Sequence, residues 1–256
     1  MQACILSSGS EGNCTYISTK NHKILLDMGT NAKYIKDHLE LIDVNADDID
    51  YVFITHTHKD HVSALPVFIK KYKPTVCISA KMFSELECLK DYDNILLFDN
   101  KVELDDNTII DIIKTSHDAE DSRSFIITND DKKIVYLTDT GYINQKYFDK
   151  LSNCELYLFE SNHDVEMLIN GPYPKMLKDR ILGPKGHLSN KDSSVYLAKL
   201  IGDKTKKIVL THLSSHNNTD ELALSTIKET FKEYDIRFKN ISCAHQKEMG
   251  EIIKVW

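Results

Sequence analysis

Three histidines and an aspartate crowd into one short stretch of the chain, 51-YVFITHTHKDHV-62. His56, His58, Asp60 and His61 follow directly on the apolar run 51–55. Side chains two residues apart in extended backbone point to the same side, so the rings of His56 and His58 can bind the same ion. Neutral imidazole and carboxylate suit Zn²⁺, and also Mn²⁺ or Fe²⁺. A lone histidine here would more simply be a solvated loop residue, but this spacing after an apolar run predicts a metal site.

Other polar residues stand where further apolar runs end. His117 follows 108–116, Asp139 follows 133–138, and His212 follows 207–211. The carboxyl ends of strands in an α/β sheet meet on one face, where ligands bind. We therefore expect His117, Asp139 and His212 to join the cluster at 56–61.

Short β-rich runs and helical patterns must position these residues. The strand-like runs lie at 3–8, 14–19, 23–29, 51–56, 75–79, 95–99, 108–116, 124–128, 133–139, 155–161 and 207–212. The helical patterns lie at 31–42, 61–72, 81–90, 144–152, 190–202 and 219–234. Mixed strands and helices without a linker or repeat predict one α/β domain over residues 1–256.

Composition narrows the class of protein. The chain has 256 residues and a formal net charge of −7, which gives no support to a generic nucleic-acid coat. No apolar run approaches the roughly 18 residues needed to cross a bilayer, and the start does not read as a secretory signal. Six cysteines without a CxxC pair favour reduced thiols. These features predict a cytoplasmic protein with no membrane partner.

Five motifs in order, LLDMG, THTHKDH, TSHDA, LTDTG and LTHLS, resemble the metallo-β-lactamase fold superfamily. The resemblance spans nearly the whole chain and implies a four-layer αββα sandwich, an α/β (α+β) fold. It implies that one metal is held by His56, His58, His117 and Asp139. It implies that a second metal is held by Asp60, His61, Asp139 and His212. It also implies that Asp27 supports the histidine loop from behind.

Charge agrees with this implied site. Two divalent ions and two carboxylates, Asp60 and Asp139, leave about +2 facing the pocket, which matches a phosphate diester. Metals ~3.5–4 Å apart can hold a bridging hydroxide and stabilise an in-line displacement. Zinc is the first expectation for the two ions, with manganese or iron as alternatives.

The stretch 183-GPKGHLSN-190 indicates a branch of the superfamily. His187 resembles a histidine of the RNase Z-like phosphodiesterases, which contacts the scissile phosphate and can protonate the leaving oxygen. Histidine suits that role because it can donate a proton near neutral pH. The alternative is a capping loop in which Ser189 or Asn190 begins a helix and His187 is incidental.

The stretch of chain around His187 is rich in basic residues. Between 171 and 191, five basic residues face one acidic residue, Asp179, a net of +4. The five are Lys175, Lys178, Arg180, Lys185 and Lys191. The chain as a whole is acidic, so this local positive charge predicts contact with a polyanion. The alternative is an ordinary helix face exposed to solvent.

Two more stretches complete the set of predicted site residues. In SSGSEGNCTY, Ser8 and Asn13 could line the rim of the pocket, or the stretch could be a plain hairpin turn. Glu160 ends the run ELYLF and is expected to support the site from behind. With FESNHD, RILGxxGHLSN and LTHLS, the first stretch resembles the WalJ/YycJ branch. That resemblance implies a phosphodiesterase with 5′-exonuclease activity on double-stranded DNA.

The sequence therefore predicts a dinuclear metal-dependent phosphodiesterase, a nuclease acting on DNA. Asp60 and His187 are the predicted catalytic residues, and Ser8, Asn13, Lys185 and His187 the predicted substrate contacts. The rivals are a small-molecule cyclic phosphodiesterase, a thioester or lactone hydrolase of the glyoxalase II type, and a non-catalytic metal protein. The pattern gives no oligomeric state.

Overall fold

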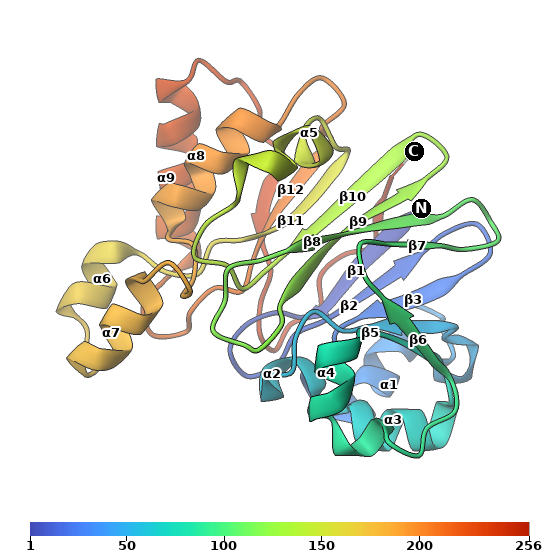
Figure 1. Ribbon diagram of the computed structural model, residues 1–256. Helices are drawn as coiled ribbons and strands as arrows, with labels where there is room; N and C mark the ends of the chain where they lie inside the picture. The colour runs from blue at the N-terminus through green and yellow to red at the C-terminus, as the bar shows by residue number, and fades with distance from the viewer. Residues whose placement is uncertain (256) are drawn as a thin grey trace.

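The computed structural model describes residues 1–255, and within them two mixed seven-stranded sheets lie face to face (Figure 1). The first sheet has the order β14 (Ile253–Lys254), β1 (Gln2–Ser7), β2 (Cys14–Ser18), β3 (Lys23–Leu26), β4 (Tyr51–Phe53), β5 (Thr75–Ser79), β6 (Ile95–Phe98). The second has the order β13 (Ile241–Cys243), β12 (Lys207–Thr211), β11 (Leu156–Glu160), β10 (Lys132–Leu137), β9 (Arg123–Asn129), β8 (Ile109–Lys114), β7 (Lys101–Glu103).

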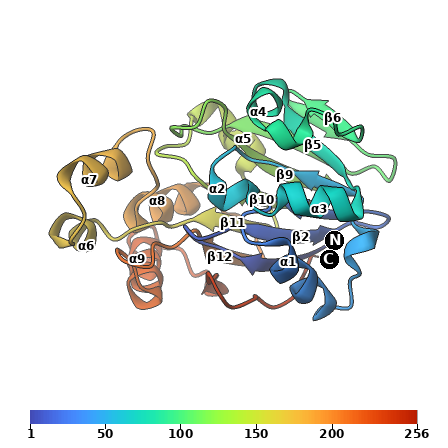
Figure 2. The same cartoon turned by 90° about the horizontal axis from the view of Figure 1, so that it is seen from below.

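Helices cover the outer faces of both sheets (Figures 1 and 2). The first sheet is covered by α1 (Ala32–Glu40), α3 (Leu65–Tyr72) and α4 (Ala80–Glu85), with the short α2 (Lys59–Val62) beside them. The second is covered by α5 (Phe148–Leu151), α8 (Asn190–Leu200) and α9 (Asp220–Glu233). The predicted four-layer αββα sandwich is confirmed. In the part of the chain that the structure describes, no helix has the length and apolar character to cross a membrane.

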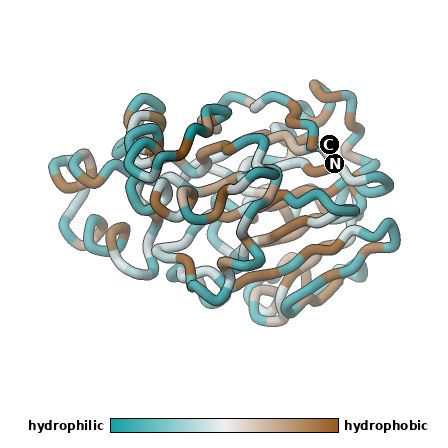
Figure 3. The backbone as a smooth tube through the Cα atoms, turned by 90° about the horizontal axis from the view of Figure 1, so that it is seen from above, coloured by the Kyte–Doolittle hydropathy of each residue, from teal (hydrophilic) through white to brown (hydrophobic). Residues whose placement is uncertain are grey.

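The core follows from alternation along the strands, because successive side chains of a strand point to opposite faces. Leu26 and Phe53 face the second sheet, whereas Leu25 and Val52 face the helices. The rings of Phe53 and Phe125 meet edge to face at 5.6 Å and join the two sheets. Figure 3 shows hydrophobic stretches running through the middle of the molecule and hydrophilic ones in many outer turns.

Parallel strands of both sheets end at the same edge of the sandwich, and the site residues gather there. Strands β3, β4 and β5 are parallel neighbours in the first sheet, and β10, β11 and β12 are parallel neighbours in the second. The loops after β3, β4, β10 and β12 carry Asp27, residues 56–61, Asp139 and His212, and the loop after β8 adds His117. The sheets thus act as a frame that presents polar loops at this edge.

Two helices were not predicted from the sequence. Helices α6 (Val165–Asn170) and α7 (Lys175–Leu182) project to one side of the sheets in both views (Figures 1 and 2). Helix α7 has apolar residues at Met176, Leu177, Ile181 and Leu182, but its eight residues are fewer than the roughly 11–18 in which a helical period can be recognised in a sequence. The single helix expected at 61–72 is instead α2 and α3, and Pro66 lies in the first turn of α3.

Candidate metal centre

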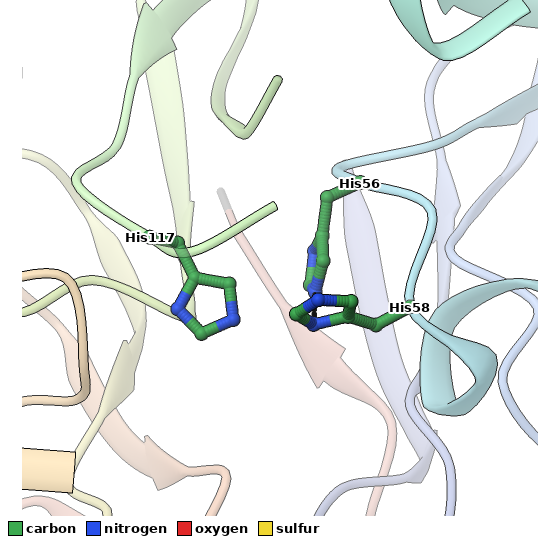
Figure 4. A group of neighbouring side chains, drawn as sticks. All are labelled: His56, His58 and His117. Carbon is green, nitrogen blue, oxygen red and sulfur yellow. Dashed lines mark hydrogen bonds between the residues drawn. The ribbon is translucent and has the colours of Figure 1, made fainter. Parts of the chain in front are cut away.

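Three imidazole rings converge between the two sheets (Figure 4). His56 and His58 lie on the loop after β4, and His117 lies on the loop after β8. His56 Nε2 is 3.1 Å from His58 Nδ1, and the rings of His56 and His117 are 5.0 Å apart. One nitrogen from each of the three rings lies within 4.8 Å of the others, so the group could hold one metal ion.

A second group lies beside the first. Ligand atoms of Asp60, His61 and His212 also fall within 4.8 Å of one another. Asp139 lies between the groups: its Oδ2 is 3.3 Å from His61 Nε2, and its Oδ1 is 3.7 Å from His117 Nε2. The structure therefore brings all seven residues that were predicted as ligands into one cluster.

Buried partners fix the orientation of the ligand rings. The Nδ1 of His61 lies 2.8 Å from Asp27 Oδ2, and Thr55 Oγ1 and Tyr136 also bond to this carboxylate. The carbonyl of Gly186 lies 3.2 Å from His117 Nδ1. In both rings Nδ1 is engaged from behind and Nε2 is turned toward Asp139. This arrangement sets the tautomer that a metal ligand needs.

Strand ends also aim the side chains by backbone conformation. Asp27, Asp139 and His212 adopt left-handed φ values of 60°, 56° and 56°. Such values are uncommon outside glycine and persist where surrounding structure imposes them. All three residues follow strand ends, at β3, β10 and β12. The turn away from strand geometry directs their side chains into the cluster.

The donor set fits divalent metal ions. His212 Nε2 is buried and has no hydrogen-bond partner among the described residues. Burial lowers the pKa of His56 and of His117, which favours the neutral ring that a metal requires. Burial would also lower the pKa of His212, but Asp139 and other nearby carboxylates outweigh it and raise the pKa to about 10. Without a metal, a proton on His212 balances those carboxylates, and a cation can take its place.

His187 lies beside the cluster, after α7. Its Nδ1 lies 2.7 Å from Glu160 Oε1, and its ring stacks on His212 at 5.2 Å. Glu160 is fully buried and also accepts a hydrogen bond from the backbone of Thr140 at 2.9 Å. Burial would raise the pKa of Glu160, but His187 and His212 outweigh it, so the carboxylate is charged. With Nδ1 engaged, His187 keeps Nε2 for a bound molecule.

A cavity of about 250 Å³ lies in front of these groups. Its far wall consists of Tyr173, Leu177, Arg180 and Ile181, from α7 and the residues before it. Arg180 pairs with Asp118, whose Oδ1 lies 3.4 Å from His117 Nε2. Asp118, Tyr173 and Leu177 were not among the site residues predicted from the sequence. Only the position of Asp118 beside His117 offered a signal.

Of the four predicted substrate contacts, His187 lines the cavity, whereas Ser8, Asn13 and Lys185 do not. Ser8 is buried, and its Oγ accepts a hydrogen bond from the backbone of His212 at 2.8 Å. Asn13 is also buried, with Nδ2 at 3.1 Å from His61 Nε2. Ser8 thus holds the backbone of His212, whereas Asn13 contacts the same nitrogen of His61 that faces Asp139. Lys185 is exposed and does not line the cavity.

Most basic side chains of the segment 171–191 do not line the cavity. Lys178 donates to the carbonyls of Ile169 and Gly171, at 2.7 Å each. Lys191 pairs with Glu233 at 2.8 Å. Of the five cations that we grouped by sequence, Arg180 alone lines the cavity.

Comparison with known proteins agrees with this geometry. Residues 8–212 match the model of the metallo-beta-lactamase superfamily. The chain is 37% identical to the exodeoxyribonuclease WalJ of Streptococcus pneumoniae over 238 residues, 91% of this chain and 88% of the relative. It is 34% identical to the exodeoxyribonuclease YycJ of Bacillus anthracis over 233 residues, 90% of this chain and 88% of the relative.

A solved structure shows the same fold. The metallo-beta-lactamase fold protein YhfI of Bacillus subtilis superimposes with a TM-score of 0.69 at 15% identity, over 98% of this chain and 99% of that one. The fold, the histidine and aspartate clusters of a dinuclear site, and the sequence match agree: the chain belongs to the metallo-beta-lactamase superfamily and is a metal-dependent hydrolase.

Proposed function

We propose that this protein is a 5′-exonuclease that hydrolyses the phosphodiester bonds of double-stranded DNA. The observation that carries the proposal is the position of His187, held at 2.7 Å by Glu160 and facing the cavity beside the metal ligands. A histidine there can give a proton to a leaving oxygen at neutral pH. The two exodeoxyribonucleases that match most of the chain support DNA as the substrate.

Each predicted residue has a place in the proposed reaction. We assign one metal to His56, His58, His117 and Asp139. We assign the other metal to Asp60, His61, Asp139 and His212. Two divalent ions, zinc first and manganese or iron as alternatives, would supply Lewis acidity and activate water there.

The chain's own groups then move the protons. Asp60 orients the attacking water and accepts its proton. His187 donates a proton to the leaving oxygen, and Glu160 stabilises the charged ring before that transfer. Asp27 keeps His61 in its ligand orientation through the 2.8 Å contact. The phosphate is attacked on one side and released on the other, as an in-line displacement requires.

Turnover by metal-loaded protein tests the proposal. The substrates are 5′-labelled duplex DNA, bis(p-nitrophenyl) phosphate and S-lactoylglutathione, and an Asp139→Asn variant controls for contaminating nucleases. We expect mononucleotides to be released from the 5′ end of the DNA, and the variant to release none. Hydrolysis of S-lactoylglutathione or of a lactone without cleavage of either diester would overturn the proposal. Cleavage of the small diester alone would replace DNA by a small phosphodiester as the substrate.

A further inference from the structure

A second, smaller hollow lies next to the catalytic cavity. It has a volume of about 130 Å³, and we call it the lysine–tyrosine hollow. It is lined by Lys114, Thr115, Ser116, Tyr142, Asn144, Lys146 and Tyr147. Ser116 immediately precedes His117, which lines the catalytic cavity. The loop that carries His117 therefore contributes to both hollows.

Two cations of this hollow lack carboxylate partners. Among residues 1–255, no carboxylate oxygen lies within 4.0 Å of the ammonium groups of Lys114 or Lys146. By contrast, nearby Lys150 pairs with Asp111 at 2.6 Å. In a chain of net charge −7, two unpaired lysines facing one hollow create a local site of positive potential. Such a site attracts an anion.

The tyrosines give the hollow a defined shape. The hydroxyl of Tyr147 accepts a hydrogen bond from the backbone of Lys114 at 3.2 Å. The ammonium of Lys146 lies 4.8 Å from the centroid of the Tyr147 ring, so this tyrosine contacts the backbone of Lys114 and the side chain of Lys146. Tyr142 is 45% exposed, and its carbonyl is fixed by the hydroxyl of Thr140 at 2.7 Å. An exposed ring on a fixed loop is a surface on which a nucleobase can stack.

The strap 183–186 runs from Ile181 to His187, which both line the catalytic cavity, and it contacts the loop of the hollow. Ser116 Oγ donates to the carbonyl of Pro184 at 2.7 Å. A side chain at Gly141 would place its Cβ 2.4 Å from the same carbonyl oxygen. The strap is therefore packed closely against Ser116, which lines the hollow, and against Gly141, which precedes Tyr142 of its lining.

We propose that the lysine–tyrosine hollow binds a phosphate of the nucleic-acid strand that flanks the scissile bond, with a neighbouring base stacked on Tyr142. The proposal rests on the function proposed above and extends it to a second site on the substrate. Lys114 and Lys146 bind the phosphate. A small diester, which ends at the scissile phosphate, does not reach them.

The test measures binding of a fluorescent duplex with phosphorothioate linkages by the metal-loaded protein at several salt concentrations. The double variant Lys114→Ala, Lys146→Ala removes one phosphate contact, so it should lower the magnitude of the log–log salt slope by about 1 and weaken binding roughly 5- to 10-fold at 0.1 M salt. The control is Lys70→Ala, Lys71→Ala, which removes the same charge from exposed positions on α3. The control should keep the wild-type slope, and both variants should hydrolyse bis(p-nitrophenyl) phosphate at the wild-type rate.

Tyr142 has its own pair of variants. Tyr142→Ala should weaken duplex binding roughly 5- to 150-fold, while Tyr142→Phe should bind like wild type because it keeps the ring. Equal binding by wild type and Tyr142→Ala would overturn the stacking contact.

The outcomes separate this proposal from the proposed function. If the wild type cleaves DNA and the lysine double variant keeps its salt slope, the hollow is not a subsite and the nuclease stands. If the wild type binds the duplex with the expected loss in the double variant but cleaves no DNA, the subsite stands and the proposed function fails. If the wild type neither binds nor cleaves the duplex, both are overturned.

Discussion

At the scale of single residues, the site depends on side chains that hold other side chains. Asp27 contacts His61, and Glu160 contacts His187, at 2.8 and 2.7 Å. Both carboxylates are fully buried, so neither can reach a substrate. Their effect on chemistry must pass through the rings that they orient, and each contact gives a prediction.

Asp27→Asn should weaken metal binding about 10- to 100-fold, because the amide keeps the shape but loses the charge that orients His61. Competition with a chelator of known affinity measures the change. The matched control is Asp220→Asn, which alters a carboxylate–histidine contact, to His245 at 3.5 Å, outside the groups that could hold a metal ion. Equal metal affinity in the Asp27 variant and wild type would show that the contact does not position His61.

His187→Ala should lower DNA turnover about 10²- to 10⁴-fold while metal content is retained. The loss should be smaller with bis(p-nitrophenyl) phosphate, because p-nitrophenolate leaves without needing a proton. Steady-state kinetics on both substrates, with metal analysis of each protein, make the comparison. An equal loss on both substrates would mean that His187 binds the phosphate rather than protonates the leaving oxygen.

Because of His163, we expect part of the free energy of unfolding to be lost at acidic pH. The side chain is buried, and burial lowers its pKa to about 4, below the usual value near 6.5. The folded protein then binds fewer protons than the unfolded chain between these values. The stabilising contribution is full above pH 6.5, declines as the pH falls toward 4, and amounts to about 3 kcal/mol in all.

Denaturant unfolding of wild type and His163→Gln between pH 4 and 7 checks this slope, with chelator present in both samples. The free energy of unfolding of the wild type should fall relative to that of the variant as the pH drops from 6.5 to 4. A difference that stays constant over this range would refute a buried neutral His163.

At the scale of elements, the loop after β3 packs so closely against the loop after β4 that an added side chain would not fit. A Cβ at Gly29, in the loop after β3, would lie 1.5 Å from the carbonyl oxygen of Asp60. Gly29→Ala must therefore displace the loop that carries Asp60 and His61. We expect a loss of more than about 2 kcal/mol in unfolding free energy, together with weaker metal binding.

Gly250→Ala is the control for this change. Its Cβ would meet its nearest neighbour at 3.5 Å, an ordinary contact, so unfolding free energy should change by less than about 1 kcal/mol. Thermal and denaturant unfolding of the two variants make the comparison. Equal stability of the two variants would mean that the loop at Asp60 yields without cost.

The elements that could be predicted from the sequence are those whose apolar residues recur with a regular period along one stretch of chain. The ligands could be found because each follows an apolar strand, as His212 follows 207–211. Helix α7 was not predicted, because its eight residues are fewer than the roughly 11–18 over which a helical period can be recognised. The wall that it gives the cavity was missed with it, and so was the pairing of Arg180 with Asp118, which joins residues far apart in the chain. Ser8 and Asn13 were identified as site residues, but their buried positions could not be read from a turn motif.

At the scale of the whole molecule, the two sheets meet at the metal centre. The first sheet presents Asp27 and the loop 56–61, and the second presents His117, Asp139 and His212. Metal ions held by both sets would join the sheets at this edge, as the Phe53–Phe125 contact joins them in the core. A ligand that binds only the folded state also stabilises that state by mass action.

The most direct test of this account is the number of metal ions bound per chain in the active protein. Metal-free protein is titrated with zinc or manganese while bound metal and release of mononucleotides from 5′-labelled duplex DNA are both measured. We expect two ions per chain, no cleavage by the metal-free protein, and full activity only when the second site fills. Saturation at one ion, or cleavage that persists without metal, would contradict it.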